Sequence, residues 1–148
     1  MKLSGIFGML VLLGLVVSSI VMGGHVGFFN MPALLIVIGV ALSMGLMSFG
    51  VKDLLDGISA MLLPFTGSPS LPDPKRTSAV LRGMIVHVYA SAAIGTLIGL
   101  IQFFRQLHDP SALGIVLSLL LLCIFYAVII AECFFRPALR RTEDMEKR

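Results

Sequence analysis

Long runs of apolar residues, separated by short polar segments, account for most of the chain. Four such runs cover residues 3–24, 31–49, 83–104 and 111–135. A helix needs about 20 mainly apolar residues to cross the hydrocarbon core of a bilayer, and each run is close to that length. The pattern therefore predicts an all-α membrane protein, with four transmembrane helices in a single membrane domain over residues 1–148.

The first run follows Lys2 and could alternatively be a signal peptide. The apolar region of a signal peptide is usually about 7 to 15 residues long, which is shorter than this run. We therefore expect the segment to be retained as a transmembrane helix.

The segments outside the apolar runs have a different composition. From Val51 to Leu63 apolar residues recur at helical spacing, which predicts an amphipathic helix at or near the membrane surface. Pro64 to Ser78 contains four prolines and predicts an irregular connector. Residues 51–82 are thus expected to form a short cytoplasmic loop with an amphipathic helix. The charged residues 136–148 are expected to form a solvated cytoplasmic tail.

The distribution of lysine and arginine predicts the orientation in the membrane. The middle loop and the tail are rich in basic residues and Lys2 precedes the first run, whereas the two hairpin turns contain only Arg105. Loops that stay in the cytoplasm carry an excess of lysine and arginine. Both termini and the middle loop are therefore expected on the cytoplasmic side, an N-in/C-in arrangement.

Composition supports the membrane class and excludes several others. Hydrophobic residues make up 57% of the chain and charged residues 13%, and the mean hydropathy is +1.02. A soluble domain of this size could not bury so much apolar surface. The net charge of +3 is explained by the topology signals, so we expect no nucleic-acid partner. The sequence contains no phosphate-binding glycine loop, paired metal ligands or catalytic-triad pattern, so we expect no enzyme, cofactor or metal site.

Small residues recur every four positions along the third run. Ser91, Gly95 and Gly99 fall on one face of a helix, where they allow another helix backbone to come close. Close packing of this kind drives helix association in lipid, where burial of apolar surface gives little gain. We expect these three residues to form a helix-packing face.

Polar groups within the apolar runs are candidates for an ion path, because burying them is costly unless they are paired or hydrated. Thr96 lies in the middle of the third run and could line such a path, or could bond to a carbonyl of its own helix. Glu132 lies near the inner end of the fourth run and could relay or gate an ion, or could pair with a nearby arginine. His87, one turn inside the third run, is expected to be a hydrogen-bonded histidine.

Several of these segments resemble one protein family. The motifs GTLIGL (Gly95–Leu100) and DPSALG (Asp109–Gly114), with Tyr126, Ala131 and Phe135–Pro137, are similar to the last two helices of the MotA/TolQ/ExbB proton-channel family. They are most similar to its flagellar-stator A-subunit branch. His25–Leu55, which contains PALLIVIG, resembles the first hairpin and second helix of that branch.

The resemblance implies a homo-oligomeric, pentameric ring of A subunits in the bacterial inner membrane. The ring would surround a single-span B-type subunit that carries an intramembrane aspartate. Ion flow, of protons or sodium, would be coupled to rotation or force. By position in the motif, Thr96 would line the ion path and Cys123 would replace one of two family threonines. In such a conducting ring Glu132 would serve as relay or gate.

The chain departs from the family pattern at several positions. Tyr89 stands where stator members carry a proline, and Ile115 replaces another. Cys123 and Ile124 occupy the positions of the threonine pair, and Glu132 that of an asparagine. The segment between the second and third helices is too short for the large cytoplasmic domain of the family, so we expect no binding to a flagellar rotor. The departures leave open a non-conducting oligomeric scaffold of the same fold, or an unrelated four-helix protein of lipid or envelope metabolism.

Overall fold

The computed structural model describes residues 3–22, 28–61, 73–108 and 110–147, and all regular structure in them is helical. In chain order the elements are α1 (Leu3–Met22), α2 (Met31–Ala60), α4 (Pro74–Arg105), α5 (Pro110–Ile129), the π-helical turn η2 (Ile130–Phe135) and α6 (Arg136–Glu146). Asp109 of the DPSALG motif, residues 23–27 and most of the proline-rich connector lie outside the described residues.

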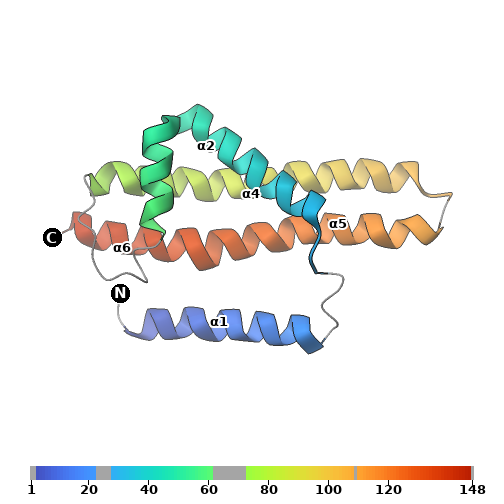
Figure 1. Ribbon diagram of the computed structural model, residues 1–148, viewed down its shortest axis with the longest axis horizontal. Coiled ribbons are helices and arrows are strands. Elements are labelled where there is room, and N and C mark those ends of the chain that lie inside the picture. The colour runs from blue at the N-terminus through green and yellow to red at the C-terminus, as the bar shows by residue number, and fades with distance from the viewer. Residues whose placement is uncertain (1–2, 23–27, 62–72, 109, 148) are drawn as a thin grey trace.

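The centre of the fold is a long antiparallel hairpin. Figure 1 shows α4 running in one direction, and α5, η2 and α6 returning beside it as one nearly continuous rod. The return helix therefore includes the charged tail, which is helical as far as Glu146. Likewise, α4 begins at Pro74, ahead of the apolar run that starts at residue 83.

Helix α2 crosses this hairpin and bends sharply at Gly50. There the backbone has φ +78° and ψ 171°, a conformation available almost only to glycine. Figure 1 shows the second half of α2 running across the hairpin, near the end where α4 begins. The run at 31–49 and the amphipathic segment after Val51 are thus two halves of one kinked helix.

Local side-chain caps explain where two of the helices begin. The Asn30 side chain accepts a hydrogen bond from the backbone N–H of Ala33, at 3.1 Å, and Pro32 lies in the first turn of α2. Asp73 makes the equivalent bond to the N–H of Arg76, also at 3.1 Å, before α4. Caps of this type satisfy backbone donors that have no partner within the helix, and proline is well tolerated there.

The core lies where α2 packs on the hairpin. Its fully buried residues are mostly small or medium-sized, and they include Val37 and Ala41 from α2, Leu81, Met84 and Val88 from α4, and Cys123, Ala127 and Ala131 from α5 and η2. Side chains of this size let the helices approach closely, which is the packing that a lipid environment favours.

Much of the remaining surface is apolar. Along α1, Phe7 is 70% exposed and Met22 89%, and Leu97 on α4 is 58% exposed. Within the described residues, three helices are long and apolar enough to cross a membrane: Met31–Ala60, Pro74–Arg105 and Leu113–Glu146. A surface of this kind is unfavourable in water, so the structure supports a helical membrane protein.

Candidate functional site

The small-residue face of α4 packs against the chain's own helices. Ser91 is fully buried and its hydroxyl donates to the carbonyl oxygen of Val88, at 2.7 Å. A β-carbon added at Gly95 would lie 2.7 Å from the sulfur of Cys123 in α5, and one at Gly99 would lie 3.0 Å from Leu120. The absence of side chains at both glycines therefore lets α5 lie against α4.

Thr96, one residue beyond Gly95, lines a groove on the outer side of the hairpin. The groove has a volume of about 440 Å³ and is lined by Tyr89, Ala92, Ala93, Thr96 and Leu97 from α4 and by Ile124 from α5. Among the described residues, no group forms a hydrogen bond with the buried hydroxyl oxygen of Thr96. The hydroxyl thus does not bond to its own helix, and an unpaired buried hydroxyl costs about 1 to 3 kcal/mol until something pairs with it.

Cys123 and Ile124 diverge although they are adjacent in sequence. The thiol of Cys123 is fully buried between α5 and α4, where it contacts Gly95. Ile124 is the residue of α5 that lines the Thr96 groove. In the isolated chain, Thr96 and Cys123 are therefore on different sides of the α4–α5 contact.

Glu132 lies on the π-helical turn and holds a partner at each carboxylate oxygen. Oε1 accepts a hydrogen bond from the hydroxyl of Tyr89 at 2.8 Å, and Oε2 lies 2.6 Å from Nε of Arg136, one turn further along. The arginine partner was one of the alternatives that the sequence left open. The tyrosine partner was not anticipated, because it lies 43 residues away on α4. Single π turns inside α-helices occur frequently at functional sites.

His87 of α4 packs beside the bend of α2 and does not line the Thr96 groove. Its Nε2 is 3.4 Å from the hydroxyl of Ser48, and its ring centroid is 5.8 Å from that of Phe49. Its Nδ1 is buried without a hydrogen-bond partner in the described part of the chain. These contacts indicate a packing role beside the kink.

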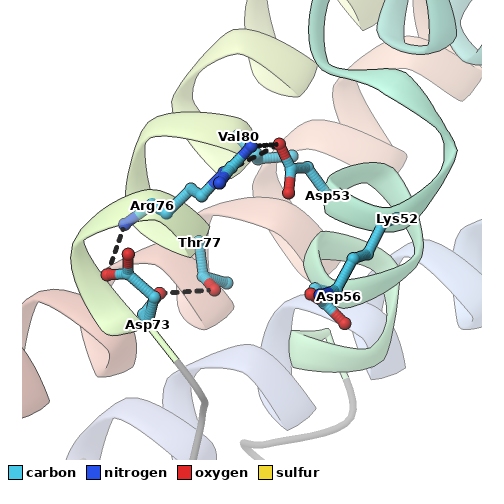
Figure 2. A pocket seen from close by; sticks show the side chains of 7 residues that line it. All are labelled: Lys52, Asp53, Asp56, Asp73, Arg76, Thr77 and Val80. Atoms are coloured by element: carbon cyan, nitrogen blue, oxygen red, sulfur yellow. Dashed lines mark hydrogen bonds and ion pairs between the residues drawn. The ribbon is translucent and has the colours of Figure 1, made fainter.

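Ion pairs join the helices at the end of the hairpin where α4 begins. Arg76 pairs with Asp53 at 2.6 Å, which ties α4 to the second half of α2. Figure 2 shows this pair at the edge of a small polar pocket of about 110 Å³, together with Lys52, Asp56, Asp73, Thr77 and Val80. Arg82 pairs with Glu143 of α6. Since these charged groups lie at a helix end, they mark a hydrated boundary of the bundle.

About midway along the return helix, a tyrosine joins α5 to the segment before α2. The hydroxyl of Tyr126 donates to the carbonyl oxygen of Phe28 at 2.6 Å and accepts from the backbone N–H of Asn30 at 2.9 Å. Tyr126 is one of the residues through which the chain resembles stator A subunits, and its contacts here are structural.

The described residues contain no group of three or more histidine, cysteine or acidic side chains able to hold a metal ion. The fold and these contacts define a class, a multi-helix membrane protein that carries a few polar side chains, among them Tyr89, Thr96 and Glu132, on one helix hairpin.

Comparison with known proteins identifies the relationship more closely. No family model matches the chain. It is 25% identical to Motility protein A of Aquifex aeolicus (strain VF5) over 215 aligned positions, which cover 99% of this chain and 85% of that protein. The resemblance inferred from the sequence motifs is therefore confirmed, and the chain is MotA-like. Because the alignment is longer than the chain, the relative has segments that this chain lacks.

Proposed function

We propose that this protein is a stator-like A subunit of an ion-driven motor in the bacterial inner membrane. Several copies, five if the family pattern holds, would form a ring around a single-span partner that carries an intramembrane aspartate. Proton or sodium flow between ring and partner would be coupled to rotation or force. The observation that carries the proposal is similarity to Motility protein A over nearly the whole chain.

The proposed topology has four spans with both termini in the cytoplasm. Besides the three described helices long enough to cross a membrane, α1 would supply the fourth span; its Leu10–Met22 part is a shorter apolar helix. Figure 1 supports this arrangement, since α1 and α4 begin, and α6 ends, at the same end of the molecule. Arg76, Arg82 and the basic residues of α6 lie at that end, as expected for a cytoplasmic face.

In this proposal the Thr96 groove is the surface that meets the partner helix. An aspartate brought into the groove would find a hydroxyl that has no other partner and can donate or accept a hydrogen bond. The alanines around it would let the partner backbone come close. The short segment between α2 and α4 leaves no room for a large rotor-binding domain, so force would be transmitted to a different receiver.

Replacing Thr96 by valine tests this role. Valine keeps the shape of threonine but removes the hydroxyl, so we expect unchanged or slightly higher stability, because an unpaired buried oxygen is lost. The hydrogen bond to a charged aspartate would be worth about 1.5 to 3 kcal/mol, so ion flux through the complex should fall roughly tenfold or more. Ser43→Ala is the matched control, since its hydroxyl already bonds to the carbonyl of Gly39.

The composition of the complex is tested by native mass spectrometry after expression with the neighbouring genes. The expected result is a ring that holds a single-span protein. Ion flux through this complex, measured separately, should depend on Thr96. Flux that is insensitive to Thr96→Val would contradict the ion-path role.

A non-conducting scaffold of the same fold is the second candidate. It is favoured by the lining of the groove, in which Tyr89 and Thr96 are the polar residues among four apolar ones. A ring that contains only lipid, or a partner without an intramembrane acid, would support the scaffold.

A further inference from the structure

Tyr89 connects two parts of the hairpin that are otherwise separate. Its side chain lines the same groove as Thr96, two helical turns away. Its hydroxyl also donates to Glu132, which is not among the residues that line the groove. Since Tyr89 is 38% exposed, it remains accessible from the groove side. Of the described residues, Tyr89 alone both borders the groove and contacts the carboxylate.

The carboxylate of Glu132 is held so that it can exchange a proton with Tyr89. The guanidinium of Arg136 pairs with Oε2 and balances the negative charge, which leaves Oε1 to the tyrosine. The tyrosine–glutamate distance of 2.8 Å is a normal hydrogen bond between a hydroxyl donor and a carboxylate acceptor. The side chain of Glu132 is 33% exposed, so water can also reach the carboxylate.

We propose that Tyr89 relays protons from the Thr96 groove to Glu132, and that Glu132 passes them to water on the side where Arg82 and Arg136 lie. The inference rests on the proposed function, which supplies a proton donor in the groove in the form of a carboxylic acid on the partner helix. It also selects between the two ions that the sequence left open, since a hydroxyl relay carries protons and cannot carry sodium.

Each transfer is balanced. The phenol O–H bond of Tyr89 breaks as its proton forms an O–H bond with Oε1 of Glu132. In the same step the phenol oxygen takes a proton from the acid in the groove, directly or through water, so that no free phenolate forms and that acid is left as a carboxylate. Glu132 finally releases its proton to water and returns to the carboxylate paired with Arg136. The groove, at about 440 Å³, is large enough to hold a water molecule between the acid of the partner helix and the hydroxyl of Tyr89.

A purely structural role for Tyr89 predicts different behaviour. In that case the hydrogen bond only holds α4 against η2, and any residue at position 132 that accepts the bond would serve. Glu132→Gln separates the two roles, because the amide oxygen can still accept from Tyr89 but the amide cannot take up and release the proton.

The test uses the complete complex of ring and partner in liposomes, with proton uptake followed by a pH-sensitive dye under a potassium diffusion potential. Tyr89→Phe and Glu132→Gln should each lower proton flux by about a hundredfold, as expected for loss of a positioned proton-transfer group. The wild type should show a solvent deuterium isotope effect that both variants lose. Tyr126→Phe is the matched control, because it removes the other tyrosine hydroxyl, which bonds to Phe28 and Asn30 and not to Glu132.

The outcomes distinguish the relay from the function on which it rests. Wild-type proton flux that depends on Thr96 but survives Tyr89→Phe, or survives Glu132→Gln, overturns the relay and leaves the stator proposal standing. A wild-type complex that conducts sodium but no protons also overturns only the relay. A complex that conducts neither ion overturns both. If native mass spectrometry shows that Tyr89→Phe disturbs assembly, the proton flux of the Glu132→Gln complex decides whether the relay stands.

Discussion

Gly95 offers the most direct test of how the hairpin is packed. An alanine there would place its β-carbon 2.7 Å from the sulfur of Cys123 and 3.1 Å from Cγ2 of Ile36. Carbon–sulfur contacts are comfortable only well beyond 3.4 Å, so α4 and α5 would have to separate or Cys123 would have to rotate. Overpacking of this kind costs about 1 to 3 kcal/mol, and Gly95→Ala should destabilise the protein by that amount.

Most of this cost should depend on one atom. In Cys123→Ala the sulfur is absent, and the closest remaining contacts to the new β-carbon are at 3.1 Å to Ile36 and 3.3 Å to the β-carbon at position 123. We therefore expect the double variant to be more stable than the sum of the single effects predicts, by about 1 to 2 kcal/mol, since residues in contact couple strongly.

The assay is reversible unfolding in mixed micelles of mild detergent and dodecyl sulfate, followed by far-ultraviolet circular dichroism. Gly39→Ala is the control, because nothing lies within 4 Å of an added β-carbon at that position of α2. It should leave stability unchanged or raise it by about 0.5 to 1 kcal/mol. Single effects that add to within about 0.5 kcal/mol would refute a close contact between Gly95 and Cys123.

Two further predictions concern α2 and are measured by the same unfolding assay. Gly50→Ala should cost about 1 to 3 kcal/mol, because φ is +78° at the kink and an L-residue is strained there; an unchanged stability would mean that the kink is not required. Asp53→Asn should cost about 0.5 to 1 kcal/mol, since its partner Arg76 is 67% exposed, and the loss should shrink in high salt. A loss that is independent of salt would show that the pair does not act through charge.

The long apolar runs and the start of α2 were predictable because their causes are local, whereas α4 begins at Pro74, within the segment expected to be an irregular connector. Hydropathy over about 20 residues is enough to indicate a helix that can enter a bilayer, whatever that helix packs against. The start of α2 at Asn30 and Pro32 likewise depends on residues within one turn of each other. The motif resemblance was also visible in the sequence, since it depends on residue identity and spacing alone, and similarity to Motility protein A supports it.

The candidate site was only partly predictable. The sequence singled out Thr96 and Glu132 because polar groups in an apolar run are conspicuous. It gave no means to tell which face of α4 Thr96 occupies relative to α5, so it grouped Thr96 with Cys123, whereas in the structure Ile124 borders the groove. Cys123 and Ile124 are adjacent in sequence, so rotating α5 about its axis by the angle between neighbouring residues would exchange them at the groove. The composition of the chain does not encode that rotation.

The sequence by itself determined that this is a helical membrane protein of MotA-like type, because apolar length and motif spacing are properties of the chain alone. Only the tertiary structure decided that Tyr89 hydrogen-bonds to Glu132, that Arg76 pairs with Asp53 and that α2 bends at Gly50. Each of these depends on how two distant helices are placed and rotated against each other. That placement follows from the close packing of small residues such as Gly95 across the whole interface, and no local pattern specifies it.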